Sequence, residues 1–172
     1  MTDAVFQNNL LAELPYLRRF ARALCGDTAL ADDLVQDCVE RALNKQHLYD
    51  ATRPLRAWLY AILRNIHVSQ WRKNSLGGFA KPLDEMEAFE GAVAPEQEQN
   101  MNLATIAEAL DLLPLQQREV LVMVALEELS YKDAAEIVGV PIGTIMSRLS
   151  RARESLRQLL AQRGIPTLRV VK

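Results

Sequence analysis

The chain has 172 residues, a formal net charge of −2, 49% apolar residues and 6% aromatic residues. It contains no run of 18 apolar residues and begins without the basic, apolar leader of a secreted protein, so we expect a cytoplasmic protein with no membrane insertion. Its length suits one ordinary domain or two small ones.

Positive charge is gathered in two segments. Residues 51–75 carry five basic and no acidic side chains, and residues 142–172 carry seven basic side chains and one acid. Residues 76–141, between them, carry three basic and thirteen acidic side chains. Because phosphate binding depends on local positive charge rather than on the mean, the chain keeps two candidate nucleic-acid surfaces.

The N-terminal residues show helical periodicity and no alternating, strand-like run. Apolar residues recur at three- and four-residue steps from Leu14 to Leu24, and Gly26 is a stop signal. Because proline fits the first turn of a helix better than its interior, Pro15 is expected near the start of this helix.

Two further helices are expected in this half. Asp27 or Thr28 can cap one over residues 28–45. Its apolar stripe comprises Leu30, Ala31, Leu34, Val35, Cys38, Val39, Ala42 and Leu43. After Pro54, another apolar row comprises Leu55, Trp58, Leu59, Ile62, Leu63 and Ile66. We interpret Trp58 as a core residue.

Metal binding is disfavoured. Cys25, Cys38, His47 and His67 are candidate ligands by type, but their spacings match no zinc pattern. The cysteines lie at helical spacing among apolar residues and are interpreted as core. No cofactor is expected.

Residues 74–100 break the pattern. They hold Gly77-Gly78, two prolines and six acids without sustained periodicity, a composition typical of a flexible linker. We therefore predict an all-α protein with two small helical domains, 1–74 and 101–172, joined by an acidic linker over 75–100. The domains are expected to move relative to each other.

The C-terminal half predicts a helix-turn-helix. Pro114 starts a helix with Val120, Leu121, Val124 and Leu126 directed inward. Ser130 and Asp133 then have capping-box spacing, and Gly139 fits a helix end that needs positive φ. A second helix begins near Ile142. Its buried row is Ile145, Leu149, Ala152 and Leu156.

The other faces of that second helix carry groups that bind DNA. They hold Thr144, Ser147, Arg148, Arg151 and Arg153. Hydroxyl and guanidinium groups donate to phosphates and to base edges in the major groove. The alternative is an ordinary helical hairpin with a solvated cationic face, but such faces usually mix both signs of charge.

These residues resemble region 4 of bacterial sigma factors. The resemblance rests on Ser130-Tyr131, Ala134-Ala135, Gly139, Pro141, Gly143-Thr144, Ser147-Arg148-Leu149 and Arg151-Ala152-Arg153. Residues 111–123 look like the helix that precedes this motif, residues 29–43 like region 2.2, and residues 53–65 like regions 2.3 and 2.4. Since no region 3 intervenes, the resemblance is to the extracytoplasmic-function (ECF) class, over about residues 10–74 and 101–162.

The resemblance implies three sites and no catalytic residues. The surface that docks on the β′ subunit of core RNA polymerase corresponds to Asp33, Gln36, Asp37 and Glu40. The surface that meets the opened −10 element corresponds to Arg64, Asn65, Trp71, Arg72 and Lys73, with Asn65 as the base reader. The −35 duplex is assigned to Thr144, Ser147, Arg148, Arg151 and Arg153. Many relatives have aspartate where this chain has Ser69.

The implied partners are core RNA polymerase (β′ and β subunits), promoter DNA and an anti-sigma factor. The sequence leaves two alternatives. A decoy that binds an anti-sigma factor without touching DNA would not need the cationic segments. A conventional helix-turn-helix repressor would leave the region 2 resemblance unexplained. An enzyme is not indicated by any catalytic motif.

Overall fold

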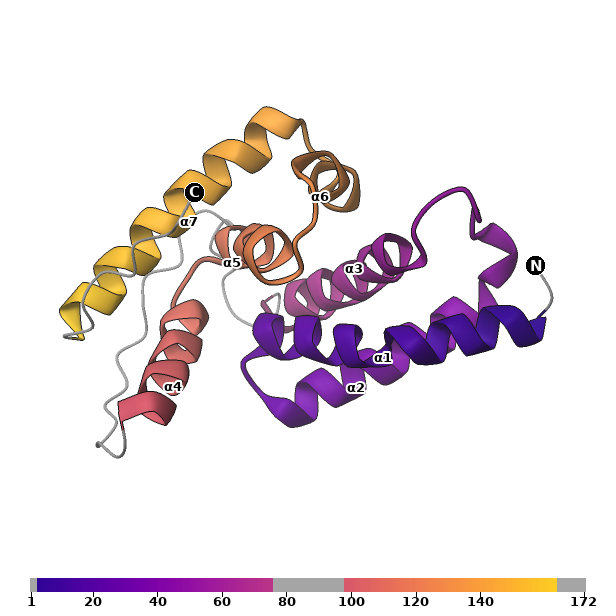
Figure 1. Cartoon of the computed structure of the whole chain (residues 1–172), viewed down its shortest axis with the longest axis horizontal. Helices are drawn as coiled ribbons and strands as arrows, with labels where there is room; N and C mark the ends of the chain where they lie inside the picture. The colour runs from indigo at the N-terminus through magenta and orange to yellow at the C-terminus, as the bar shows by residue number, and fades with distance from the viewer. Residues whose placement is uncertain (1–2, 76–97, 164–172) are drawn as a thin grey trace.

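The computed structural model describes residues 3–75 and 98–163, and every regular element within them is helical (Figure 1). The N-terminal half contains α1 (Asp3–Cys25), α2 (Thr28–Asn44), the 3₁₀ turn η1 (Gln46–Leu48) and α3 (Leu55–Ser75). The C-terminal half contains α4 (Glu98–Asp111), α5 (Leu115–Leu121), the π-helical turn η2 (Val122–Leu126), α6 (Tyr131–Val138) and α7 (Ile142–Gln162). The all-α prediction is confirmed. Most of the expected linker, residues 76–97, lies outside the described residues.

The first helix is longer than expected. α1 begins at Asp3 and carries Pro15 in its interior, so the prediction of a start near Pro15 was wrong. Phe6 and Leu10 are both buried and extend the apolar stripe two turns further toward the N-terminus. Their burial offsets the hydrogen bond that proline cannot donate, and Pro15 itself is exposed.

The second helix begins as predicted, with Asp27 as its N-cap. Its buried stripe is narrower than expected, because Leu30 is 60% exposed and Leu43 is 38% exposed. Both residues lie at the edges of the row that runs from Ala31 to Ala42. Helical spacing gives the direction of a stripe, but only packing fixes its width.

The C-terminal half forms the predicted helix-turn-helix from α6 and α7. Ser130 caps α6 by accepting a hydrogen bond from the Asp133 amide at 3.1 Å, and Gly139 ends it with φ 76° and ψ 38°. Leu126, expected inward, is 40% exposed. The π turn η2 adds a residue to the helical repeat, which turns Leu126 toward solvent.

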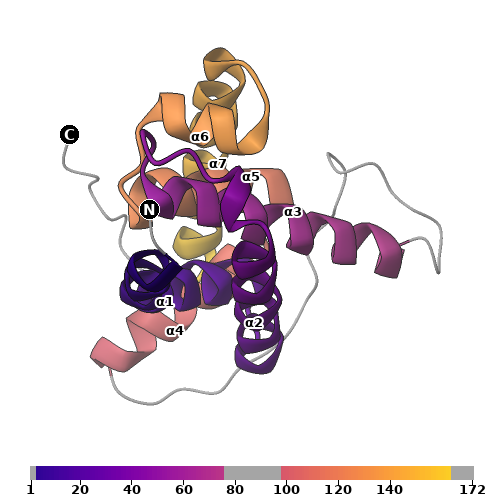
Figure 2. The same ribbon diagram turned by 90° about the vertical axis from the view of Figure 1, so that its right-hand side faces the viewer.

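The two halves pack against each other, as both views show (Figure 1; Figure 2). α1 contacts α4, α5 and η2, and α3 contacts α6. We call this contact the seam. Most of the buried apolar residues of both halves form one continuous hydrophobic cluster. Local periodicity did not indicate this contact, since it joins segments far apart in the chain.

Candidate polymerase and nucleic-acid interfaces

The residues predicted to bind polymerase lie together on the exposed side of α2. They are Asp33, Gln36, Asp37 and Glu40. Asp27 orders the start of the helix by accepting a hydrogen bond from the Leu30 amide at 2.8 Å, and the buried row determines which side faces solvent. Asp37 also accepts a bond from Gln70 Nε2 of α3 at 3.1 Å. The structure therefore forms an exposed patch of carboxylates backed by core.

The residues predicted to meet the −10 element lie on the C-terminal turns of α3, but in different environments. Asn65, Arg72 and Lys73 are exposed, and Trp71 is half-buried. Arg64 is only 15% exposed and turns toward the seam. Four of the five predicted residues can therefore be reached from solvent, whereas Arg64 is already paired.

The predicted −35 residues lie along α7. Arg151 and Arg153 are exposed and have no ion-pair partner in the described part of the chain. Ser147 is exposed and donates to the Thr144 carbonyl at 3.0 Å, while Thr144 is half-buried. Arg148 is 20% exposed and leans toward α5. Of the three predicted arginines, Arg151 and Arg153 thus have free guanidinium groups and Arg148 is engaged.

A buried carboxylate that was not predicted joins these two sites. Glu119 of α5 has a side chain only 2% exposed. Arg64 binds it through two bonds, Nε to Oε2 at 2.8 Å and Nη2 to Oε1 at 3.0 Å. Arg148 Nη1 lies 3.9 Å from the same Oε1. Glu119 shares a helical face with Leu115 and Met123, so its place in an apolar row was the signal available in the sequence.

A second buried carboxylate crosses the seam nearby. Glu127 accepts bonds from Arg19 Nε at 2.7 Å and Arg19 Nη2 at 2.9 Å, and also from the Tyr60 hydroxyl. Burial and the bond to this carboxylate raise the pKa of Tyr60. Arg118 Nη1 adds a bond to the Leu24 carbonyl at 2.9 Å, near the end of α1. None of these contacts was expected from the sequence.

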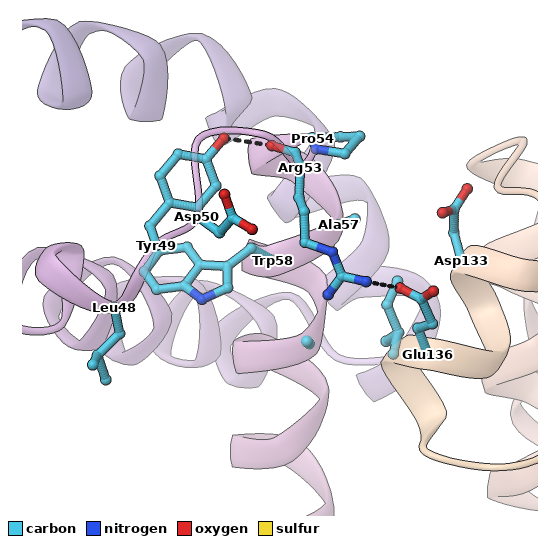
Figure 3. Close-up of a pocket in the computed structure, with 11 residues that line it drawn as sticks. Leu48, Tyr49, Asp50, Arg53, Pro54, Ala57, Trp58, Asp133 and Glu136 are labelled. Atoms are coloured by element: carbon cyan, nitrogen blue, oxygen red, sulfur yellow. Dashed lines mark hydrogen bonds and ion pairs between the residues drawn. The ribbon is translucent and has the colours of Figure 1, made fainter. Parts of the chain in front are cut away.

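A cleft of about 280 Å³ opens where α6 meets the start of α3 (Figure 3). Arg53 reaches across it to the Glu136 carboxylate, and the Tyr49 hydroxyl donates to the Arg53 carbonyl at 2.6 Å. Trp58 packs beside Tyr49 with ring centroids 5.3 Å apart. It is half-buried and packs against the core as interpreted, but it also lines the cleft. The cleft is part of the seam.

The described residues contain no group of three or more His, Cys, Asp or Glu side chains able to hold a metal ion. Cys38 is buried and donates to the Leu59 carbonyl at 3.5 Å, and Cys25 is half-buried. Burial raises the pKa of the Cys25 thiol to about 11 and that of Cys38 to about 12, so both remain protonated. No helix in the described ranges is long and apolar enough to cross a membrane.

Both halves of the chain match known protein families. One family model, the Sigma2 domain of PhyR, matches residues 10–64, and another, Sigma-70 region 4, matches residues 103–156. The chain is 39% identical over 166 residues to the ECF RNA polymerase sigma factor EcfG of Rhodopseudomonas palustris (strain TIE-1), covering 93% of this chain and 87% of that protein. It is 31% identical over 150 residues to the ECF RNA polymerase sigma factor SigL of Mycobacterium tuberculosis (strain H37Rv), covering 87% and 85%.

Solved structures agree with this assignment. The fold is similar to that of the sigma factor RpoE in complex with the anti-sigma factor NepR from Bartonella quintana, with TM-score 0.75, 39% identity, and coverage of 91% of this chain and 96% of that chain. It is also similar to CnrH in complex with the cytosolic domain of CnrY, with TM-score 0.70, 26% identity, and coverage of 94% and 90%. These matches include both helical halves and nearly the full length of the relatives, so the chain belongs to the family of ECF RNA polymerase sigma factors.

Proposed function

We propose that this chain binds core RNA polymerase through the acidic side of α2 and directs it to promoters that α3 and α7 recognise. The observation that carries the proposal is the separation of charge on the surface. Carboxylates gather on α2, whereas Arg72, Lys73, Arg151 and Arg153 are exposed on the two cationic helices. Within this proposal, residues 1–74 serve polymerase and the −10 element, residues 75–100 link the domains, and residues 101–172 serve the −35 element.

The two cationic helices suit different forms of DNA. α7 belongs to a helix-turn-helix, whose second helix enters the major groove of intact duplex. The end of α3 combines an amide, Asn65, with an indole, Trp71, and two cations. An amide can bond a base edge in two directions, and an aromatic ring can stack on an unpaired base. We assign α7 to the −35 duplex and α3 to the opened −10 strand.

Run-off transcription with purified core polymerase and a promoter library tests the whole proposal. We expect promoter-specific initiation that depends on this chain. A second candidate is a decoy, because the N-terminal half matches the Sigma2 domain of PhyR, a protein described in one solved complex as an anti-anti-sigma factor. Tight binding to an anti-sigma factor, combined with no initiation on any promoter, would favour the decoy.

The polymerase surface has its own test. Asp37→Arg reverses a charge at the centre of the acidic side of α2 and should sharply reduce capture of core polymerase. Asp32→Arg is a matched control, since Asp32 is exposed on the same helix but outside the predicted patch. If both variants bound core polymerase equally well, the acidic patch would be an ordinary solvated surface rather than a polymerase-binding site.

Base reading is tested on templates opened in advance over the −10 element. Asn65→Ala should reduce selectivity among such templates, because opening removes the cost of unpairing but does not replace a lost base contact. Unchanged selectivity would remove Asn65 as the base reader. Ser69 is exposed one turn beyond Asn65, so Ser69→Asp is the companion variant.

We further propose that an anti-sigma factor controls this chain. The support is that two similar sigma factors were solved in complexes with other chains, RpoE with the anti-sigma factor NepR and CnrH with the cytosolic domain of CnrY. We expect that adding such a partner abolishes run-off transcription. An excess of the sigma factor should then restore transcription.

A further inference from the structure

Glu119 places two residues with different proposed DNA targets in one ion-pair cluster. Its Oε1 lies 3.0 Å from Arg64 Nη2 and 3.9 Å from Arg148 Nη1. Because both nitrogens approach the same oxygen, they cannot be more than about 7 Å apart. Arg64 belongs to the N-terminal half, and Glu119 and Arg148 belong to the C-terminal half.

That distance is incompatible with simultaneous promoter contact. Elements centred at −10 and −35 lie about 25 base pairs apart, or roughly 85 Å of duplex at 3.4 Å per base pair. Two side chains held within 7 Å of each other cannot serve both elements. The seam must therefore open before the chain can contact a promoter as proposed above.

The bonding at Glu119 also competes with DNA. A guanidinium group binds a phosphate or a guanine edge through a pair of parallel N–H donors. In Arg64 this pair of donors is already bonded to the Glu119 carboxylate. The carboxylate is nearly inaccessible to solvent, so water does not weaken the pair as it does at a surface. Arg64 is therefore unavailable to DNA while the seam is closed, and Arg148 is partly shielded.

We propose that Glu119 is an internal competitor of promoter DNA, a latch that holds the free chain in a closed conformation and releases Arg64 and Arg148 when the seam opens. The inference rests on the proposed function, because it needs these arginines to contact DNA. Glu127 is a second latch of the same seam. It binds Arg19 and Tyr60, neither of which is assigned to DNA.

The two latches allow a controlled experiment on the free, full-length chain. Glu119→Gln and Glu127→Gln each remove one buried charge and keep the shape of the side chain. Small-angle scattering reports whether each variant is more extended than the wild type. Fluorescence anisotropy with a labelled −35 duplex reports DNA binding, and the matched control is Glu154→Gln, which removes an exposed charge from α7 itself and does not touch the seam.

We expect both latch variants to be more extended and to bind the duplex about tenfold or more tightly, because apparent affinity rises with the fraction of open chain. Glu154→Gln should give a smaller gain and no change in size. The latch is refuted if neither variant expands. Competition with DNA is refuted if the variants expand without a gain in affinity, or if Glu154→Gln gives the same gain. The size measurement does not depend on DNA, so it stands even if wild-type run-off transcription fails and overturns the proposed function.

Discussion

His67 is a titratable group whose protonation conflicts directly with the folded structure. It lies on α3, largely buried, and its Nδ1 has no hydrogen-bond partner among residues 3–75 and 98–163. Burial, followed by the positive charges of Arg118 and Arg64, lowers the pKa of His67 to about 4. In an unfolded chain the pKa of a histidine is near 6.5. Between pH 6.5 and 4, His67 is protonated in the unfolded protein and neutral in the folded protein. The free energy of unfolding therefore decreases as the pH falls from 6.5 to 4.

The expected loss follows from the size of the shift. At about 1.4 kcal/mol per pKa unit, the change amounts to roughly 3 kcal/mol by pH 4 and is absent above about pH 7. This is a substantial part of the 5–15 kcal/mol that typically stabilises a folded domain. Urea unfolding of the wild type and of His67→Gln, at several values between about pH 7.5 and 4.5, measures it as the difference between the two curves.

Comparing variants removes the contribution of the carboxylates, which titrate over part of the same range in every protein tested. The wild type should lose more stability than His67→Gln as the pH falls. His47→Gln is the matched control, because His47 is the other histidine of the chain and is exposed on η1. A constant difference between the wild type and His67→Gln across the range would refute the reasoning. The reasoning would also be refuted if His47→Gln, rather than His67→Gln, reduced the loss of stability at low pH.

Two further predictions concern turns and buried polar groups. Gly26 has φ +68°, and an added Cβ would lie 2.5 Å from Asp111 Oδ1, so the carboxylate would have to move away from its 3.1 Å ion pair with Arg118. Gly139 has φ +76° and open space around it. Gly26→Ala should therefore lower the free energy of unfolding by more than the roughly 1–2 kcal/mol expected for Gly139→Ala, as compared by urea denaturation. Tyr60→Phe removes a hydrogen bond to the buried Glu127 carboxylate and should cost about 1–3 kcal/mol in the same assay, while the packing of the ring persists.

Much of the fold could be predicted because its determinants are local. Ser130 caps α6 three residues from its bonded amide, and Gly139 takes the left-handed conformation expected of a residue that ends a helix. The errors came from features that local spacing does not determine. Pro15 was assigned to a helix start, although buried apolar residues on both sides keep it inside a continuous helix. Leu126 was assigned to the core, although the π turn shifts the helical phase by one residue.

The seam was missed for a different reason. Its bonds join residues 55 to 108 positions apart, such as Arg64 with Glu119 and Arg19 with Glu127. Apolar periodicity reports only on residues a few positions apart, so it cannot predict contacts between residues so far apart in the sequence. Residues 51–75 contain no acid, so Arg64 was counted among free cations although its counter-ion lies in another segment. The positions of the predicted surface residues on their helices followed from the sequence, but the engagement of Arg64 and Arg148 required the tertiary contacts.

The alternation of charge along the chain therefore has two consequences rather than one. Local charge alone predicts that the cationic segments are nucleic-acid surfaces, since DNA supplies the negative charge that they lack. The acidic segment between them supplies the same complement from within the chain, as Glu119 does for Arg64 and Glu136 does for Arg53. These two pairs differ in burial, because the Glu136 side chain is 41% exposed and that of Glu119 is 2% exposed. An exposed ion pair contributes little to the stability of the fold. Removing one partner of a buried pair is destabilising, because it leaves a buried charge that water cannot solvate. The buried Glu119 carboxylate is therefore the partner that Arg64 and Arg148 must leave before they can bind DNA.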